Sequence, residues 1–172
     1  MSERTRKHIE WRIASNESGR KGIAYYIENA PQLKLALQRV SEGQLSAWLR
    51  WVRTTRDGVK YLAWQMKQYF DDKPYDDICV YAQELQRSQA NRIAMSVITR
   101  NFYFNWRYVH NKSIRTDLFS DTNHVINANY CDVYATKEPK QAKYAAYLLT
   151  GATRICTYDP GQTSIRQWLL SL

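Results

Sequence analysis

The stretch CDVYATKEPKQAKYAAYLLTGATRICTYD, residues 131–159, decides the fold that we expect for this chain. It begins with CDVYAT, which is typical of a short buried strand, and ends with ATRICTYD, which indicates a second strand. Between them, Pro139 suits the first turn of a helix, with Thr136 as a candidate cap, and Gly151 suits its end. The order strand, helix, strand implies two parallel strands joined by a crossover helix.

The segments around this stretch are mostly helical in pattern. A short helix is expected around Val125 and Ile126, and a final amphipathic helix over residues 165–172. Farther upstream, helices are expected over residues 23–40 with a break at Pro31, around 45–52, over 59–70, and over 75–111, which contains no Gly or Pro. In HIEWRIAS, by contrast, Ile9, Trp11 and Ile13 alternate with charged residues, which favours a half-buried strand.

The expected fold class is therefore α/β, mainly helical with a small parallel sheet. A chain of 172 residues is long enough for one substantial core, so we expect a single domain over 1–172. Within it, residues 1–115 form a basic, mostly helical part, and residues 116–172 form a β-α-β-α part that carries an acidic cluster.

The excess of positive charge lies in the first two-thirds of the chain. The net charge is +9; residues 1–115 hold 20 Lys and Arg against 11 Asp and Glu, whereas residues 116–172 hold 5 against 5. Basic charge attracts polyanions because binding releases their counterions, so RNA or another nucleic acid is the first partner to expect. A basic surface with no such partner is the alternative.

Several classes of protein are disfavoured by composition. The three cysteines are odd in number, lie far apart and form no C-x-x-C pair, which argues against a disulfide framework or a zinc knuckle. The N-terminus has no apolar signal region, and no run is long enough to span a membrane. We expect a soluble cytoplasmic protein that does not interact with membranes.

The candidate chemistry lies in four acids near the expected strand and helix ends: Asp117, Asp121, Asp132 and Glu138. Asp117 and Asp121 lie one helical turn apart, and Glu138 follows the first strand at the edge where ligands bind in parallel sheets. Carboxylates in this arrangement suit Mg2+ or Mn2+. The alternative is that these acids only cap helices or favour the positive end of a helix dipole.

The segment 117–172 resembles the C-terminal half of PIN-like nucleases: an acid-bearing helix (DLFSDTNH), a strand ending in Thr and an acid (CDVYATKE), a helix, a last strand (TRICTY) and a closing helix. The resemblance implies that Asp121 and Glu138 hold the third and fourth family acids, with Asp117 as an accessory and Glu84 as a loose candidate for an earlier one. It implies Mg2+ or Mn2+ as cofactor and RNA as substrate. The family opens with a strand that ends in an aspartate, but this chain has no aspartate before Asp57.

Candidate nucleic-acid contacts are Arg100, Arg107, Lys112 and Arg115. Arg100 and Arg107 flank an aromatic run, FYFNWRY, that could stack on bases. Packing of these rings into a core or an interface is the stronger alternative. His124, one turn after Asp121, is either a phosphate contact or an ordinary helix side chain, and the second is favoured.

The resulting expectation is a metal-dependent ribonuclease of PIN-like type, of the toxin or defence-effector kind. A non-catalytic nucleic-acid-binding module on the same scaffold is the main alternative. A protein-interaction subunit that uses its six Trp and thirteen Tyr residues at an interface is the third. A homo-oligomer or a partner chain could supply the acid that the first part of the chain lacks.

Overall fold

The computed structural model describes residues 3–67, 70, 72–88, 91–149, 151, 153–159, 161 and 164–170. This part of the chain is mainly helical with a small parallel sheet, as the sequence predicted. The elements in chain order are α1 (Glu3–Glu28), α2 (Pro31–Gln38), α3 (Glu42–Thr54), η1 (Arg56–Gly58), α4 (Val59–Lys67), α5 (Tyr75–Arg87), α6 (Arg92–Val109), α7 (Thr116–Asn127), η3 (Ala128–Tyr130), β1 (Val133–Thr136), α8 (Pro139–Leu148), β2 (Arg154–Thr157) and α9 (Ile165–Leu170).

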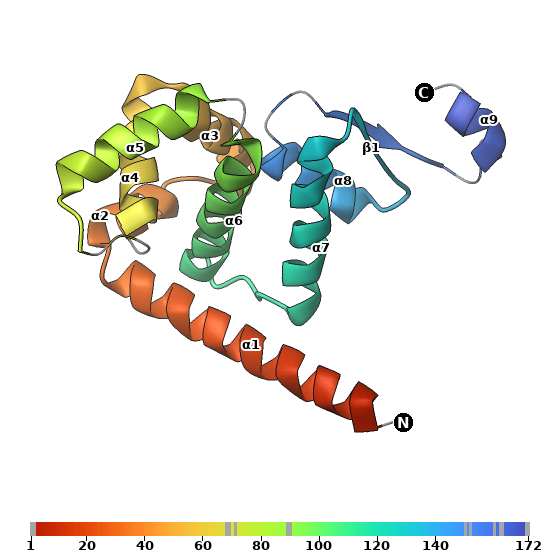
Figure 1. Ribbon diagram of the computed structural model, residues 1–172, viewed down its shortest axis with the longest axis horizontal. Coiled ribbons are helices and arrows are strands. Elements are labelled where there is room, and N and C mark those ends of the chain that lie inside the picture. Colours follow the sequence, from red (N-terminus) through yellow and green to blue (C-terminus); the bar gives the residue numbers. More distant parts are fainter. Residues whose placement is uncertain are drawn as a thin grey trace.

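Helix α6 occupies the centre of the molecule (Figure 1). It packs against helices from both sides of the fold, namely α1, α2, α3, α4, α5, α7 and α8. Its aromatic run is buried: Phe102 is 1% exposed, Tyr103 3% and Trp106 2%. Phe104 is also buried, whereas Tyr108 is only partly buried. Most rings of this run therefore fill the core, and the packing alternative is confirmed.

Buried polar contacts fix α6 to its neighbours, and two of them join it to the first half of the chain. The Trp106 indole nitrogen donates to the Val40 carbonyl at 2.7 Å, at the turn between α2 and α3. The Asn105 amide donates to the Gln65 side-chain oxygen at 2.7 Å, on α4. Buried polar groups need such partners, because each would otherwise lose its hydrogen bonds to water.

The sheet contains two parallel strands at one edge of the fold. Val133 pairs with Arg154 and Thr136 with Thr157, with α8 as the crossover, so the predicted β-α-β-α order is confirmed. The prediction that CDVYAT is a buried strand was wrong in one respect. β1 is only partly buried and β2 mostly exposed, because the sheet packs mainly against one helix, α8.

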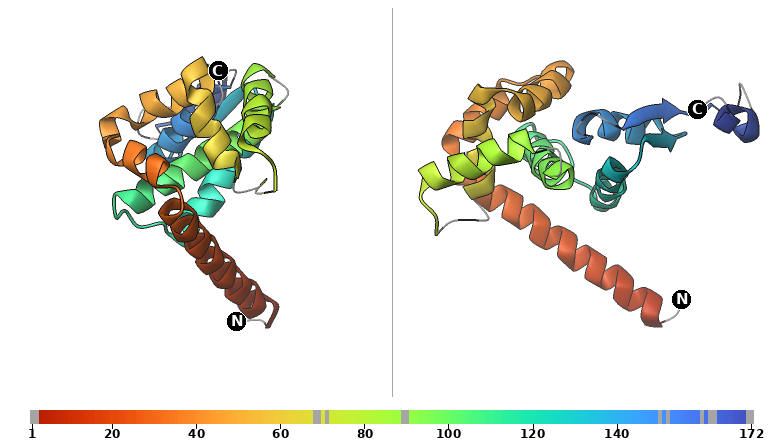
Figure 2. Two further views of the ribbon diagram at one scale, coloured as in Figure 1. Left: turned by 90° about the vertical axis from the view of Figure 1, so that its left-hand side faces the viewer. Right: turned by 45° about the horizontal axis from the view of Figure 1, so that its top comes forward.

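Residues 9–13 form part of α1, so the predicted strand at HIEWRIAS was wrong. A strand needs a neighbouring strand for its backbone hydrogen bonds, whereas a helix satisfies its own. The apolar and charged alternation covers only five residues, which is too short to outweigh this advantage. The N-terminal half of α1 extends away from the other helices (Figure 2).

The described part of residues 75–111 contains two helices, α5 and α6, so the prediction of one long helix, straight or kinked, was also wrong. Ser88 after α5 has extended backbone angles, φ −88° and ψ 113°, and α6 begins at Arg92. Ser88 is the C-cap of α5 and Asn91 the N-cap of α6, and Ser and Asn favour helix ends because their side chains compete for backbone hydrogen bonds.

Gly58 allows the close approach of η1 to the end of α3. A β-carbon at this position would lie 2.3 Å from the Val52 carbonyl oxygen and 2.7 Å from its carbonyl carbon.

Gly58→Ala is expected to lower the free energy of unfolding by about 1–3 kcal/mol, because rigid backbone must move. Gly22→Ala, within α1 where no atom lies within 4 Å of the new methyl group, should be neutral or stabilising by up to about 1 kcal/mol. Urea denaturation of the two variants checks this, and equal stabilities would contradict the packing described for Gly58.

Candidate nucleic-acid interface

A hollow of about 220 Å³ lies where α3, α6, α7 and α8 meet, and several predicted site residues line it. We call it the Tyr103 hollow, after the tyrosine that α6 contributes to it. Its charged lining consists of three carboxylates and four cations: Glu42, Asp117, Asp121, Arg107, Arg115, Lys140 and Lys143. Three tyrosines and a tryptophan complete most of the wall: Tyr103, Tyr144, Tyr147 and Trp106.

Asp117 and Asp121 both line the Tyr103 hollow from the same face of α7, as their four-residue spacing predicts. Asp117 forms an ion pair with Arg115 at 3.5 Å, with both side chains largely exposed. Such an exposed pair contributes little to stability. Asp121 is half-buried and has no ion pair within the described residues.

Glu138 lies outside the lining of the Tyr103 hollow. It is the exposed N-cap residue of α8, where its backbone N–H donates to the Thr136 hydroxyl at 3.1 Å. Glu138 and Asp121 nevertheless both influence the hydroxyl of Tyr134 electrostatically. The pKa of Tyr134 on β1 is raised by burial first, and then by the charges of Asp121 and Glu138.

The remaining predicted acids and the histidine lie apart from this group. Glu84 belongs to α5, on the other side of α6 (Figure 1), and lies 3.6 Å from Arg87. Asp132 is exposed before β1, and His124 is exposed near the end of α7. None of the three lines the Tyr103 hollow.

The four cations predicted to contact nucleic acid all have partners within the chain. Arg100 donates to the Asn123 side chain. Arg107 donates to the Ser113 carbonyl and to the Tyr103 hydroxyl, the latter at 3.1 Å. Lys112 pairs with Glu42, and Arg115 with Asp117. Of these four, Arg107 and Arg115 line the Tyr103 hollow.

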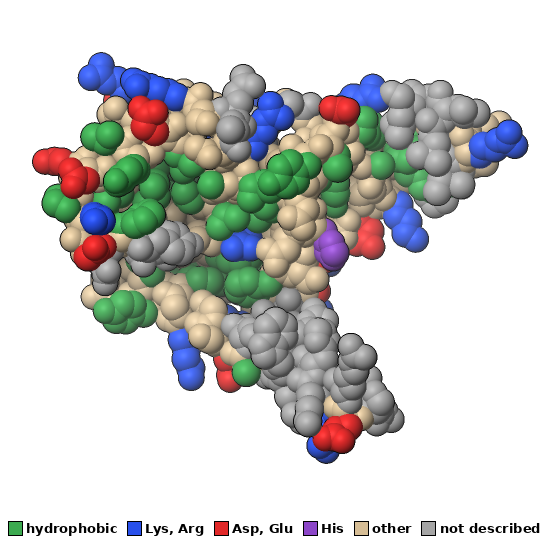
Figure 3. All heavy atoms as spheres, in the orientation of Figure 1, with side chains coloured by type: hydrophobic (Ala, Val, Ile, Leu, Met, Phe, Trp, Pro, Cys, Tyr) green, Lys and Arg blue, Asp and Glu red, His purple; other side chains and the backbone are tan. Residues whose placement is uncertain are grey.

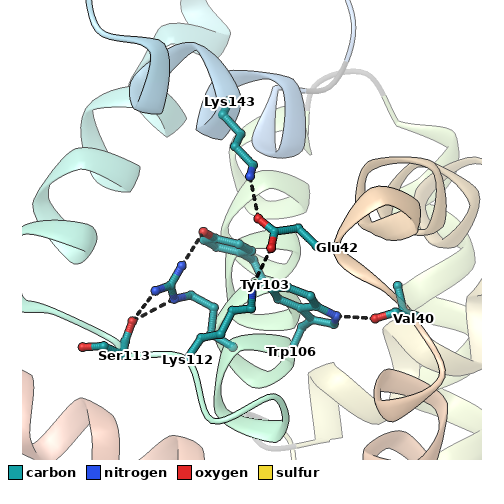
Figure 4. A network of polar contacts seen from close by, with 8 residues as sticks. Val40, Glu42, Tyr103, Trp106, Lys112, Ser113 and Lys143 are labelled. Carbon is teal, nitrogen blue, oxygen red and sulfur yellow. Dashed lines mark hydrogen bonds and ion pairs between the residues drawn. The ribbon is translucent and has the colours of Figure 1, made fainter.

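Glu42 is a functional candidate that the sequence interpretation missed. Its carboxylate lies between Lys112 and Lys143, and its oxygen is 2.7 Å from the Lys143 amine (Figure 4). Hydrogen bonds from Lys112 and Lys143 lower the pKa of Glu42 to about 2. In the sequence, Glu42 is only an acid in the first turn of a helix that begins with a Ser41–Gln44 capping box. Its partners lie 70 and 101 residues away, so no local pattern indicates them.

This charge balance does not suit a bound dication. Four cations outnumber three carboxylates around the Tyr103 hollow, and Glu42 and Asp117 are already paired with cations. Within the described part of the chain, no three His, Cys, Asp or Glu side chains form a group that could hold a metal ion. The residues present therefore do not fit the Mg2+ or Mn2+ that the sequence resemblance implies.

The same balance suits an anion. Tyrosine hydroxyls are protonated at neutral pH, and burial raises the pKa of Tyr144 and of Tyr147 further, so both can donate hydrogen bonds. Lys140 is exposed at the hollow and has no ion pair in the residues that the structure describes. A phosphate at this position would meet cations and hydroxyl donors together.

Comparisons with known proteins do not assign the chain to a family: no family model, no curated protein and no solved structure matches it. Among the described residues, no helix combines the length and the apolar character needed to cross a lipid bilayer.

The ion pairs of Glu42 with Lys112 and Lys143 stabilise the fold at neutral pH and should do so less in acid. The pKa of Glu42 in the folded state, about 2, lies below the ordinary value of 4.5. The contribution of its ion pairs to the free energy of unfolding is therefore complete above about pH 4.5 and is lost as pH falls toward 2. Glu42→Gln should lower the unfolding free energy at pH 7 by about 1 kcal/mol or less, because the carboxylate is half-exposed and screened by solvent.

Chemical denaturation at pH 7, 4.5 and 2.5 checks this. The difference between wild type and Glu42→Gln should shrink at the lowest pH. Glu17→Gln, which removes an exposed carboxylate on α1, is the matched control and should follow wild type. A constant difference at all three pH values would contradict the assigned role of Glu42.

Proposed function

We propose that the protein is a nucleic-acid-binding module that does not hydrolyse its ligand, with single-stranded RNA as the first candidate. The observation that carries this proposal is the excess of cations over carboxylates around the Tyr103 hollow. An environment of net positive charge attracts phosphate and repels the dication that hydrolysis would need.

The distribution of charge over the molecule supports the same function. Lys and Arg number 25 against 16 Asp and Glu. On the face drawn in Figure 3, the basic side chains are dispersed among acidic and apolar ones. A dispersed surface charge increases the encounter rate with a polyanion, but it does not by itself position the ligand. The hollow supplies a defined position.

Contact with nucleic acid would use the exposed cations at the rim of the Tyr103 hollow, Arg115 and Lys140. Arg107 and Lys112, which are tied to neighbouring groups, would hold the shape of the hollow. The buried rings of Tyr103 and Trp106 are not available for stacking on bases. Affinity would therefore come mainly from phosphate contacts and fall steeply with salt.

The ribonuclease remains the second candidate because Asp117 and Asp121 line one hollow from one helix face. Hydrolysis by these two carboxylates would need further ligands from the substrate or from a second chain, together with release of Asp117 from Arg115. Ribonuclease activity ranks below nucleic-acid binding because cations outnumber carboxylates around the Tyr103 hollow.

Fluorescence anisotropy with a labelled single-stranded RNA tests the proposal. The plot of log affinity against log salt concentration should have a negative slope, about −0.7 for each phosphate contacted. The double variant Arg115→Gln/Lys140→Gln should weaken binding and reduce the steepness of that slope by roughly 1.4, because two phosphate contacts are lost. Lys60→Gln, a charge removal on α4 across the molecule from α7, should leave the slope unchanged.

The same RNA incubated with Mn2+ separates the two candidates. Intact RNA after incubation agrees with the binding module. Manganese-dependent cleavage that Asp121→Asn abolishes would overturn it in favour of the ribonuclease.

A further inference from the structure

A second and larger hollow lies on another side of α3. It has a volume of about 840 Å³, within the usual range for ligand pockets, and lies between α3, the end of α5, the start of α6, the end of α8 and the start of β2. Three arginines line it, Arg50, Arg53 and Arg92, and we call it the arginine hollow. No Asp or Glu of the described residues belongs to its lining.

The Arg53 guanidinium is held in this hollow by backbone carbonyl groups and not by a carboxylate of the described residues. Its guanidinium donates to the Tyr147 carbonyl at 3.0 Å and to the Leu149 carbonyl at 3.3 Å, at the end of α8. Burial, and then the nearby charge of Arg50, lowers the pKa of Arg53 to about 10. Arg50 and Arg53 lie three residues apart on α3 and line the same hollow, so two like charges are neighbours. Neither has an ion pair in the described part of the chain. An anion between them would reduce their repulsion.

The start of α6 adds a further positive field. Arg92 and Met95, from the first turn of this 18-residue helix, line the hollow. The N-cap residue Asn91 makes no side-chain capping hydrogen bond. The N-terminal end of a long helix carries partial positive charge and N–H groups suited to phosphate oxygens.

The other walls indicate the rest of the ligand. Ser46, Thr54 and Ser88 supply hydroxyl groups near the arginines. Leu85, Leu149 and Ile155 supply apolar surface in the same hollow. A bare anion would occupy little of the volume and would not contact this apolar surface. A phosphate attached to a larger, partly apolar group would occupy the hollow and contact the apolar wall.

We propose that the arginine hollow binds a phosphate monoester through Arg50, Arg53 and the N-terminus of α6, with the apolar wall against the group that carries the phosphate. The planar guanidinium fork matches the oxygens of a phosphate group. A free nucleotide and the terminal phosphate of a nucleic-acid strand share this chemistry. The site is separate from the Tyr103 hollow, and it does not require that nucleic acid bind there.

Ala146 provides a matched pair of variants for this site. It is an exposed residue of α8 that lines the arginine hollow without contacting Arg53 in any hydrogen bond. Ala146→Glu places a carboxylate in the hollow, whereas Ala146→Gln places a neutral group of nearly the same size there. Both residues are good helix formers, so the two variants should fold alike.

Calorimetric titration and thermal unfolding with AMP, with adenosine and with inorganic phosphate test the proposal at constant ionic strength. AMP should raise the Tm of wild type and of Ala146→Gln, and inorganic phosphate should do so more weakly. Adenosine should have no effect. Ala146→Glu and Arg50→Gln should each weaken AMP binding by about tenfold or more, because a charge-assisted contact is opposed or lost. Arg166→Gln on the distant α9 should bind as wild type does (Figure 2).

Competition by 5′-phosphorylated RNA against its 5′-hydroxyl counterpart identifies the source of the phosphate. Selective competition by the phosphorylated strand assigns a nucleic-acid end, and selective binding of AMP assigns a free nucleotide. Equal AMP binding by wild type, Ala146→Glu and Arg50→Gln would overturn the proposal and leave Arg53 as a structural cap of α8. Because the AMP titrations use no RNA and no variant of the Tyr103 hollow, their failure is distinct from failure of the proposed function.

Discussion

The fold depends on the burial of helix α6 among seven other helices. Its aromatic side chains, with Phe102 and Trp106 almost fully excluded from water, provide the largest apolar surfaces in the core. The core to which they belong includes residues from Ile27 to Leu149, so the helices before α6 and the crossover helix after it pack against the same element. Both hollows are consequences of this packing. One lies beside the C-terminal half of α6, between α7 and α8, and the other lies at its N-terminus.

The two hollows differ in how their charges are compensated. In the Tyr103 hollow, Glu42 has two lysines and Asp117 has an arginine as partners, so most charges have a partner within the chain. In the arginine hollow, Arg53 has only carbonyl oxygens as partners, and Arg50 raises the electrostatic cost of its charge. Desolvated charges that lack an opposite charge are expensive and are common at functional sites. This difference is the reason for assigning the more specific ligand to the arginine hollow.

Local patterns in the sequence were sufficient for the C-terminal part of the fold. Pro139 begins α8 as predicted, and the strand, helix, strand order implied the parallel pairing that β1 and β2 show. The predicted end at Gly151 was wrong, because α8 ends at Leu148 and Leu149 already has extended backbone angles. The same approach failed at residues 9–13, where a short alternation was outweighed by the lack of a strand partner. It also failed at Ser88, where extended backbone angles end α5 although the sequence contains no Gly or Pro there.

The sites were less predictable than the fold, because their residues meet across long sequence separations. The spacing of Asp117 and Asp121 correctly placed both on one face, since this is a property of one helix. No local pattern shows that Lys112 and Lys143 neutralise Glu42, or that Arg53 reaches carbonyls 94 and 96 residues away. The arginines of the larger hollow come from two helices and looked like ordinary surface cations in the sequence.

We propose that the charges of this protein are arranged to hold phosphate and not a metal ion. Anomalous diffraction from a crystal soaked with both manganese and tungstate, an analogue of phosphate, tests it most directly. The account predicts tungstate in the arginine hollow in contact with Arg50, and no manganese between Asp117 and Asp121. Manganese bound by these two aspartates, with the arginine hollow free of tungstate, would contradict it.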